Sequence, residues 1–232
     1  MRVGVIIFPG SNCDRDTYWA LDSIEEVEVS YLWHQDCNSQ LVGMDMVVLP
    51  GGFSYGDYLR TGAFARFSPI MEAVSEFSSQ GGLIMGICNG FQILLEAGLL
   101  PGAMLPNRSL RFICDWVNIR VENIDLPFTG RLNPHTVLKI PIAHFEGNYF
   151  ADDDTISHIE SNNQVVFRYC SLDGDIDEKY NPNGSVNNIA GIVNDAGNVL
   201  GMMPHPERAS DKILGSEDGR EIFRSVIKWM NR

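Results

Sequence analysis

One cysteine stands where a short apolar run gives way to a helical pattern. Cys88 lies in the segment GICNG at residues 86–90, after the apolar residues 83–85. Small residues two positions either side of a nucleophile permit a sharp strand-to-helix turn, because a Cβ there would collide with neighbouring backbone. The turn sets the sulfur at a helix N-terminus, where unpaired N–H groups favour the thiolate. The pattern predicts a catalytic thiol, and the alternative is a buried core cysteine.

Two of the five histidines could serve this thiol as a general base, since each has a carboxylate two residues later. The pairs are His144 with Glu146 and His205 with Glu207. In extended chain these positions share a side, so the carboxylate can hold one imidazole nitrogen and leave the other for the sulfur. The pattern alone does not choose between the pairs. We favour His205 and Glu207, because prolines flank the histidine on both sides, and we expect His144 to contact substrate or stabilise a loop.

Oxyanion donors are also predicted close to the cysteine. In enzymes with this turn, one donor is the N–H group after the nucleophile, here Asn89, and another comes from an earlier loop. The glycines before Phe53 end the third predicted strand, and Gly52 would let backbone approach a substrate closely. Each such donor is typically worth about 3–4 kcal/mol of barrier lowering. A plain strand-ending turn is the alternative.

Composition excludes several classes of function. The chain has 232 residues, 44% hydrophobic and 20% charged, with a formal net charge of −13, and no basic run offsets that charge. A nucleic-acid partner is therefore not expected. No apolar run approaches the ~20 residues that span a membrane, and no signal peptide is expected, so the cytoplasm is the predicted compartment. Five single cysteines without a C-x-x-C pair indicate neither a disulfide framework nor a metal site.

Strand and helix signals alternate through the first hundred residues. They predict an α/β fold with an open, mainly parallel sheet and helices on both faces. The expected strands there are 3–8, 27–33, 46–49 and 83–85, and the expected helices are 17–26, 65–78 and the one after Cys88. The C-terminal half predicts an antiparallel edge extension with strands at 111–121, 137–142, 165–169, 189–193 and 199–203, closed by a helix at 217–230. No linker is evident, so residues 1–232 are predicted to form a single domain.

These residues together resemble the class I, or triad, glutamine amidotransferases. The resemblance rests on residues 86–92, on the glycines at 51 and 52, and on His205-Pro206-Glu207. Longer segments resemble a glutaminase subunit within that family, namely 8–16, 50–60, 141–144, 181–185 and 201–208. The resemblance covers nearly the whole chain. Phe145 departs from the family pattern, where a glycine is usual, and leaves the geometry of the His144 loop open.

The resemblance implies a defined reaction. Cys88 would attack the side-chain amide of L-glutamine to give a γ-glutamyl thioester, with N–H groups near Gly52 and Asn89 holding the oxyanion. His205, steered by Glu207, would pass a proton to the departing ammonia. Gln92 lies one helical turn past the nucleophile and is expected to contact the substrate.

The resemblance also implies partners. Ammonia would pass to a large synthetase subunit, which uses ATP to convert formylglycinamide ribonucleotide to the amidine in purine biosynthesis. A small accessory subunit would belong to the same complex. The pattern G-x-x-x-x-G-K-[ST] is missing from this sequence, so no cofactor is expected in this chain, and ATP and Mg²⁺ are expected on the synthetase. Activity is expected to stay low until the subunits dock.

Three other interpretations stay open at this point. The chain could be a cysteine hydrolase or protease of similar fold, or the glutaminase of another synthetase, such as one making GMP or carbamoyl phosphate. It could also be a non-catalytic regulatory subunit, although the cysteine, histidine and glutamate are all present.

Overall fold

The computed structural model describes residues 1–36 and 41–231, so Cys37 lies outside the described residues. The strands of these ranges are β1 Arg2–Ile7, β2 Glu28–Trp33, β3 Met46–Leu49, β4 Leu83–Ile87, β5 Ala103–Pro106, β6 Ile113–Val121, β7 Val137–His144, β8 Glu146–Phe150, β9 Val165–Cys170, β10 Ile189–Val193 and β11 Val199–Met202. The α-helices are α1 Asp14–Asp22, α2 Ile70–Ser79, α3 Asn89–Glu96, α4 Asp153–Ser161 and α5 Asp218–Met230.

Nine strands form one mixed sheet in the order β2-β1-β3-β4-β11-β10-β9-β6-β7. The first five run parallel to their neighbours. Their central members are continuous apolar runs with both faces covered, and every residue of β3 and β4 is buried. The predicted α/β class with a mainly parallel half is therefore confirmed.

The sheet changes direction after β11. Strands β10, β9, β6 and β7 pair antiparallel in turn, and β5 pairs with β8 in a separate two-stranded sheet. The predicted antiparallel extension is confirmed for these strands. For residues 199–203 it holds on one side only: β11 pairs antiparallel with β10 but parallel with β4, with Met202 opposite Ile87. Alternation of apolar residues does not encode the direction of a strand, so the sequence left this pairing open.

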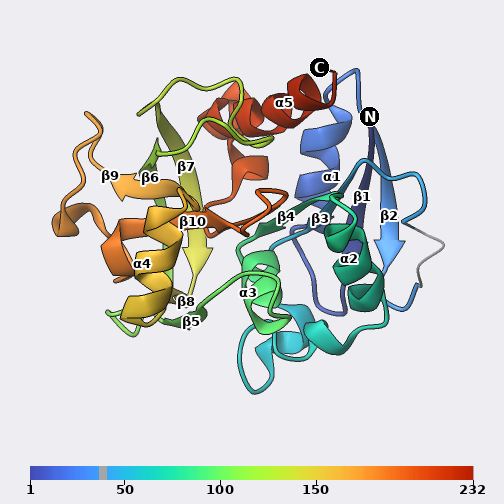
Figure 1. Ribbon diagram of the computed structural model, residues 1–232, viewed down its shortest axis with the longest axis horizontal. Helices are drawn as coiled ribbons and strands as arrows, with labels where there is room; N and C mark the ends of the chain where they lie inside the picture. Colours follow the sequence, from blue (N-terminus) through green and yellow to red (C-terminus); the bar gives the residue numbers. More distant parts are fainter. Residues whose placement is uncertain (37–40, 232) are drawn as a thin grey trace.

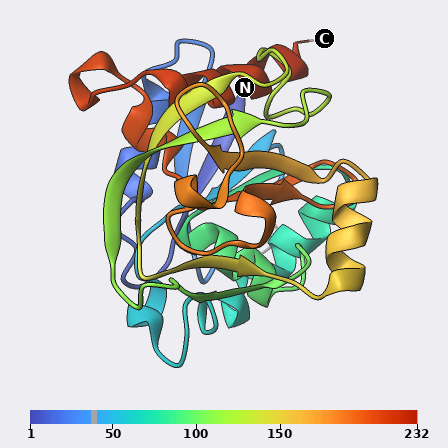
Figure 2. The ribbon, with the colours of Figure 1, turned by 90° about the vertical axis from the view of Figure 1, so that its left-hand side faces the viewer.

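Helices cover both faces of the parallel half. Helices α1 and α5 lie on one side of the sheet, and α2 and α3 lie on the other (Figures 1 and 2). The predicted helix at 65–78 is broken in two, because Pro69 holds Ser68 in an extended conformation with ψ of 137°. A short 3₁₀ turn therefore precedes α2. Helix α4 was not predicted, and it buries only Ile159.

No helix among the described residues is long and apolar enough to cross a membrane.

Candidate active site

The segment 86–90, here called the nucleophile elbow, has the backbone that the sequence predicts. Cys88 joins β4 to α3 with φ of 49° and ψ of −105°, a conformation that L-residues other than glycine rarely adopt. A Cβ on Gly86 would lie 2.7 Å from the carbonyl carbon of Gly90, and one on Gly90 would overlap the carbonyl oxygen of Leu49. Glycine is therefore required at both positions for the turn to close.

Strand pairing brings His205 to this elbow. The Cys88 N–H donates to the carbonyl oxygen of Met202 at 2.8 Å, which continues the β4–β11 ladder to the end of both strands. His205 follows three residues later, and its own N–H donates to the carbonyl oxygen of Pro141 in β7 at 2.8 Å. The histidine is thus anchored on both sides, at the carboxyl edge of the parallel strands, where ligands bind in open α/β sheets.

His205 and Glu207 form a buried pair. Nδ1 of His205 lies 2.6 Å from Oε1 of Glu207, and the two side chains are 2% and 0% exposed. Burial lowers the pKa of His205, but the negative charges of Glu207 and of a Cys88 thiolate outweigh burial and raise that pKa well above its ordinary value. Nε2 of His205 has no hydrogen-bond partner among the described residues, so it is available to a thiol or a leaving amine.

The alternative pair is not formed. Nε2 of His144 faces the side-chain amide of Asn183 at 3.2 Å, whereas the Glu146 carboxylate accepts a hydrogen bond from Thr61 at 2.8 Å. Burial lowers the pKa of His144 to about 3, and the nearby charge of His205 acts in the same direction. His144 is therefore a neutral, buried imidazole whose hydrogen bonds go to the loop at 181–185. The structure brings His205 and Glu207 together and keeps His144 and Glu146 apart.

The predicted oxyanion donors lie on two connected segments. Gly52 has φ of +131°, and a Cβ there would stand 2.7 Å from the N–H nitrogen of Asn12. The N–H of Ser54 donates to the side-chain oxygen of Asn89 at 3.1 Å. This bond ties the loop after β3 to the first residue of α3. Phe53, between these positions, is 45% exposed, so the backbone N–H groups of this loop lie close to the surface.

The side chain of Gln92 is already engaged. Its amide donates to the backbone oxygen of Glu146 and accepts from the Asn89 amide at 3.0 Å. Asn89 also approaches Asp57, whose pKa is raised to about 6 by burial and by the charge of Glu146. The observed contacts of Gln92 connect α3 to the start of β8. A contact between Gln92 and glutamine stays a prediction.

Sequence reasoning missed Cys13 and Arg208. Cys13 is buried beside His205 and Glu207, and its sulfur accepts a hydrogen bond from Arg208 Nη2 at 3.1 Å. Arg208 also pairs with Asp16 at 3.1 Å, which links the start of α1 to the residues after His205. One signal could have pointed to Cys13: it lies in the loop between the parallel strand β1 and α1, and such loops meet at the sheet edge that also holds Cys88.

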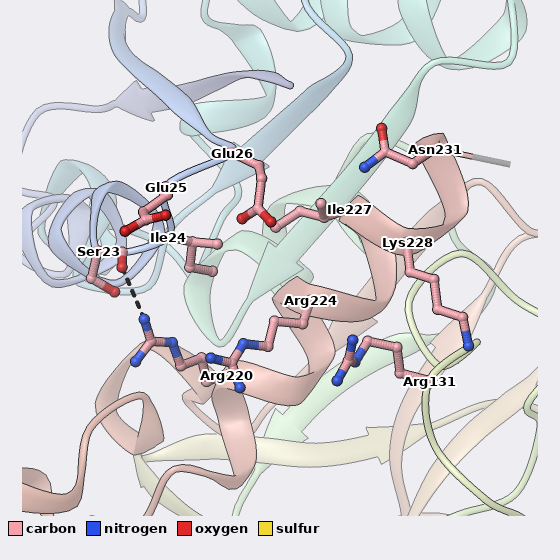
Figure 3. Close-up of a pocket in the computed structure, with 10 residues that line it drawn as sticks. All are labelled: Ser23, Ile24, Glu25, Glu26, Arg131, Arg220, Arg224, Ile227, Lys228 and Asn231. Atoms are coloured by element: carbon pink, nitrogen blue, oxygen red, sulfur yellow. Dashed lines mark hydrogen bonds between the residues drawn. The ribbon is translucent and has the colours of Figure 1, made fainter.

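A cavity of about 730 Å³ lies elsewhere, between the C-terminal end of α1 and α5 (Figure 3). Its cations already have partners. Arg131 and Arg224 share Glu221, and Arg220 donates to the backbone oxygen of Ser23 at 2.9 Å. None of the predicted site residues lines this cavity, so it is separate from the candidate active site.

Comparisons with known proteins agree with this site. The CobB/CobQ-like glutamine amidotransferase domain matches residues 1–231, so the chain belongs to the CobB/CobQ-like glutamine amidotransferase family. The phosphoribosylformylglycinamidine synthase subunit PurQ of Moorella thermoacetica is 59% identical over 100% of this chain and 98% of its own length. The same subunit of Koribacter versatilis is 56% identical over 98% and 97%. These identities group the chain with the PurQ subunits.

Solved structures give the same result. A chain in the structure of PurLQS from Thermotoga maritima is 45% identical, with a TM-score of 0.87, and the match covers 99% of this chain and 98% of that one. A putative GMP synthase component from Thermoplasma acidophilum shares the fold, with a TM-score of 0.64 at 16% identity over 98% and 92%. The resemblance to the glutamine amidotransferases is thus confirmed.

Proposed function

We propose that this chain is the glutaminase subunit of a phosphoribosylformylglycinamidine synthase, and that Cys88, His205 and Glu207 carry its chemistry. The observation that carries the assignment of these residues is the register of β4 with β11, which sets the nucleophile elbow beside the buried His205–Glu207 pair. The full-length similarity to PurQ subunits supports the choice of synthetase. The GMP synthase alternative has only a shared fold in its favour.

The reaction follows from the three side chains. The Cys88 sulfur attacks the carboxamide carbon of glutamine, and the C–N bond breaks after the oxyanion has formed near the N–H groups of Gly52, Phe53 and Asn89. Nε2 of His205 gives a proton to the leaving nitrogen, which departs as ammonia. A water molecule, deprotonated by the same nitrogen, then cleaves the γ-glutamyl thioester and releases glutamate. Glu207 holds Nδ1 and so fixes the orientation of the imidazole.

The ammonia acceptor lies on another subunit in this proposal. The large synthetase subunit would convert formylglycinamide ribonucleotide to the amidine with ATP and Mg²⁺, in the cytoplasm, with a small accessory subunit in the complex. Cys88 exposes only 5% of its surface. This coverage supports a low rate of glutamine hydrolysis until the synthetase docks.

The test is Cys88→Ala in the reconstituted complex. We expect glutamine-dependent amidine synthesis to fall to background, because no thioester can form, while synthesis from added ammonium salt continues at the wild-type rate. Both rates are measured by product formation. Loss of both activities, with the complex still assembled, would contradict the proposal that this chain hydrolyses glutamine and the synthetase subunit makes the amidine. Cleavage of peptides by the wild-type chain, without glutamate release from glutamine, would favour a protease instead.

A further inference from the structure

We propose that Cys13, His205 and Glu207 form a binding site for Zn²⁺, and that occupation of this site stops glutamine hydrolysis. The binding site stands on geometry alone, whereas its inhibitory effect rests on the proposed function. One ligand atom from each residue lies within 4.8 Å of the others, and all three residues are buried. Sulfur, imidazole nitrogen and carboxylate oxygen are the atoms that protein zinc sites use, with three protein ligands and one open position in catalytic sites.

One further observation points to a ligand at this place. Oε2 of Glu207 is buried without a hydrogen-bond partner among the described residues, in a residue only 2% exposed. A buried carboxylate oxygen without a partner is costly, and a cation would satisfy it. Gly51 borders the same cluster. A Cβ there would lie 2.8 Å from Cε1 of His205 and 3.3 Å from both Sγ of Cys13 and Nδ1 of His205, so glycine lets the backbone lie directly against these side chains.

The charges balance when the ion binds. Zn²⁺ would displace the thiol proton of Cys13, which leaves to solvent, and the proton between His205 Nδ1 and Glu207 would move to Nε2 of the same imidazole. The thiolate and carboxylate then neutralise the two charges of the ion. Arg208 contacts the Cys13 sulfur, but it keeps Asp16 as its partner if that contact lengthens.

Inhibition follows because the ion binds Nδ1 of His205. A neutral imidazole bound to zinc through Nδ1 carries its proton on Nε2. Nε2 then cannot accept a proton from Cys88 or from the hydrolytic water. The ion also separates His205 from the carboxylate that orients it. His205 and Glu207 therefore serve either the reaction or the metal, but not both at once.

Binding is tested with Cd²⁺, a spectroscopic substitute for Zn²⁺ whose bonds to thiolate absorb in the ultraviolet. The purified full chain, freed of metal, should gain this absorption with one equivalent of Cd²⁺. Cys13→Ala should lose it, whereas Cys88→Ala and Cys114→Ala should keep it, Cys114 being an exposed thiol used as the matched control. Absorption that survives in Cys13→Ala, or that disappears in Cys88→Ala, would overturn the site.

A second variant guards against loss of folding. Glu207→Gln keeps the thiols of Cys13 and Cys88 and the shape of the side chain at 207, but it removes the anionic ligand. We therefore expect Zn²⁺ to bind at least tenfold more weakly, as measured by competition with a chelating dye. Unchanged affinity would contradict the proposal. Far-ultraviolet circular dichroism checks that each variant is folded.

Inhibition is measured separately. Glutamate release by the complex is followed with and without Zn²⁺, and each variant is compared with its own rate in the presence of chelator. Wild type should be inhibited, and Cys13→Ala should need at least tenfold more Zn²⁺ for the same loss. Equal inhibition would place the ion on Cys88 and overturn the proposal. Metal binding without glutaminase activity under any condition would instead refute the proposed function and leave the site standing.

Discussion

Strain at one residue positions the nucleophile. Cys88 has a φ of 49°, a backbone conformation that costs of order 1–3 kcal/mol and persists only where the surrounding structure enforces it. Here the enforcing contacts are the ladder bond to Met202 on one side and helix α3 on the other. The strained conformation sets the sulfur at the start of helix α3, where Sγ lies 3.7 Å from the backbone oxygen of Ala143 in β7.

The buried histidines His205 and His144 should respond differently to substitution. In His205→Ala we expect kcat for glutamine hydrolysis to fall by about 10²–10⁴, because general acid–base catalysis is lost. In the matched variant His144→Ala we expect kcat to stay within about tenfold of wild type, since His144 is neutral and contacts only structural groups. Steady-state assays of glutamate release give both values. If only His144→Ala abolishes hydrolysis, the triad is misassigned.

His144 should also make stability depend on pH. Its pKa is about 3 in the folded chain and 6.5 when unfolded, so the unfolded chain binds more protons between these values. The stabilising effect of this burial is therefore complete above about pH 6.5 and is lost as pH falls, by at most about 1.4 kcal/mol per pH unit. Asp57, with its raised pKa of about 6, acts in the opposite direction between 3.8 and that value.

A matched variant separates the contributions of His144 and Asp57 to the pH dependence of stability. His144→Gln retains a hydrogen-bonding group toward Asn183 but has no titrating group, and Asp57 is unchanged in it. Urea unfolding of both proteins at several pH values should show that the free energy of unfolding falls more steeply in wild type as the solution is acidified. Parallel curves would mean that His144 is protonated in the folded chain.

At the scale of elements, the nucleophile elbow depends on how closely α3 approaches β3. We expect Gly90→Ala to lower the free energy of unfolding by about 3 kcal/mol or more, because its methyl group would overlap the backbone oxygen of Leu49, which cannot move without breaking the sheet. The control is Gly98→Ala, at φ of +71° with open space around it, where the cost is about 1–2 kcal/mol from backbone strain alone. Chemical denaturation measures both. Equal losses would show that the elbow tolerates a wider separation.

Sequence reasoning succeeded where local chemistry determines structure. The buried strands, the elbow and the proline-flanked histidine follow from apolar runs, glycine spacing and fixed backbone angles. It failed where pairing between distant segments decides. The direction of β11 and the existence of β5 and β8 depend on neighbours that no local pattern names.

The surroundings of the site depend on tertiary contacts even more strongly. Asn183 shows this best: it is fully buried, and its side chain contacts His144, Gly147 and Tyr169 while accepting from Ser185. A turn-like N-P-N-G-S segment gives no local sign of that role. Cys13 likewise looks like one of several isolated cysteines, because its neighbour His205 comes from the other end of the chain.

At the scale of the molecule, exposed apolar side chains surround the site. Phe53 and Phe112 stack with ring centroids 6.5 Å apart, and Leu110 and Phe145 continue the surface, with exposures of 71% and 42%. We call these four residues the apolar rim. Phe53 follows Gly52, a proposed oxyanion residue, and Phe145 follows His144, so a partner that covers the rim would also cover the proposed active site.

The rim should therefore be part of the contact with the synthetase. We expect Leu110→Glu to weaken assembly with the synthetase by about tenfold or more, because a charge would be buried at the interface. The control is Val42→Glu, which should leave assembly unchanged. Val42 is 78% exposed and precedes β3, so it lies toward the amino ends of the parallel strands, whereas the proposed site lies at their carboxyl ends. Calorimetric titration of the two proteins measures the difference. Equal affinities would locate the contact elsewhere.

The pairing of β4 with β11 has a consequence for synthesis of the protein. The thiol emerges from the ribosome early, and the imidazole that must serve it is among the last parts to appear. A nascent polypeptide therefore carries a nucleophile that cannot yet turn over. The order in which the strands are translated therefore separates the thiol from its proposed base until the last tenth or so of the chain has been made.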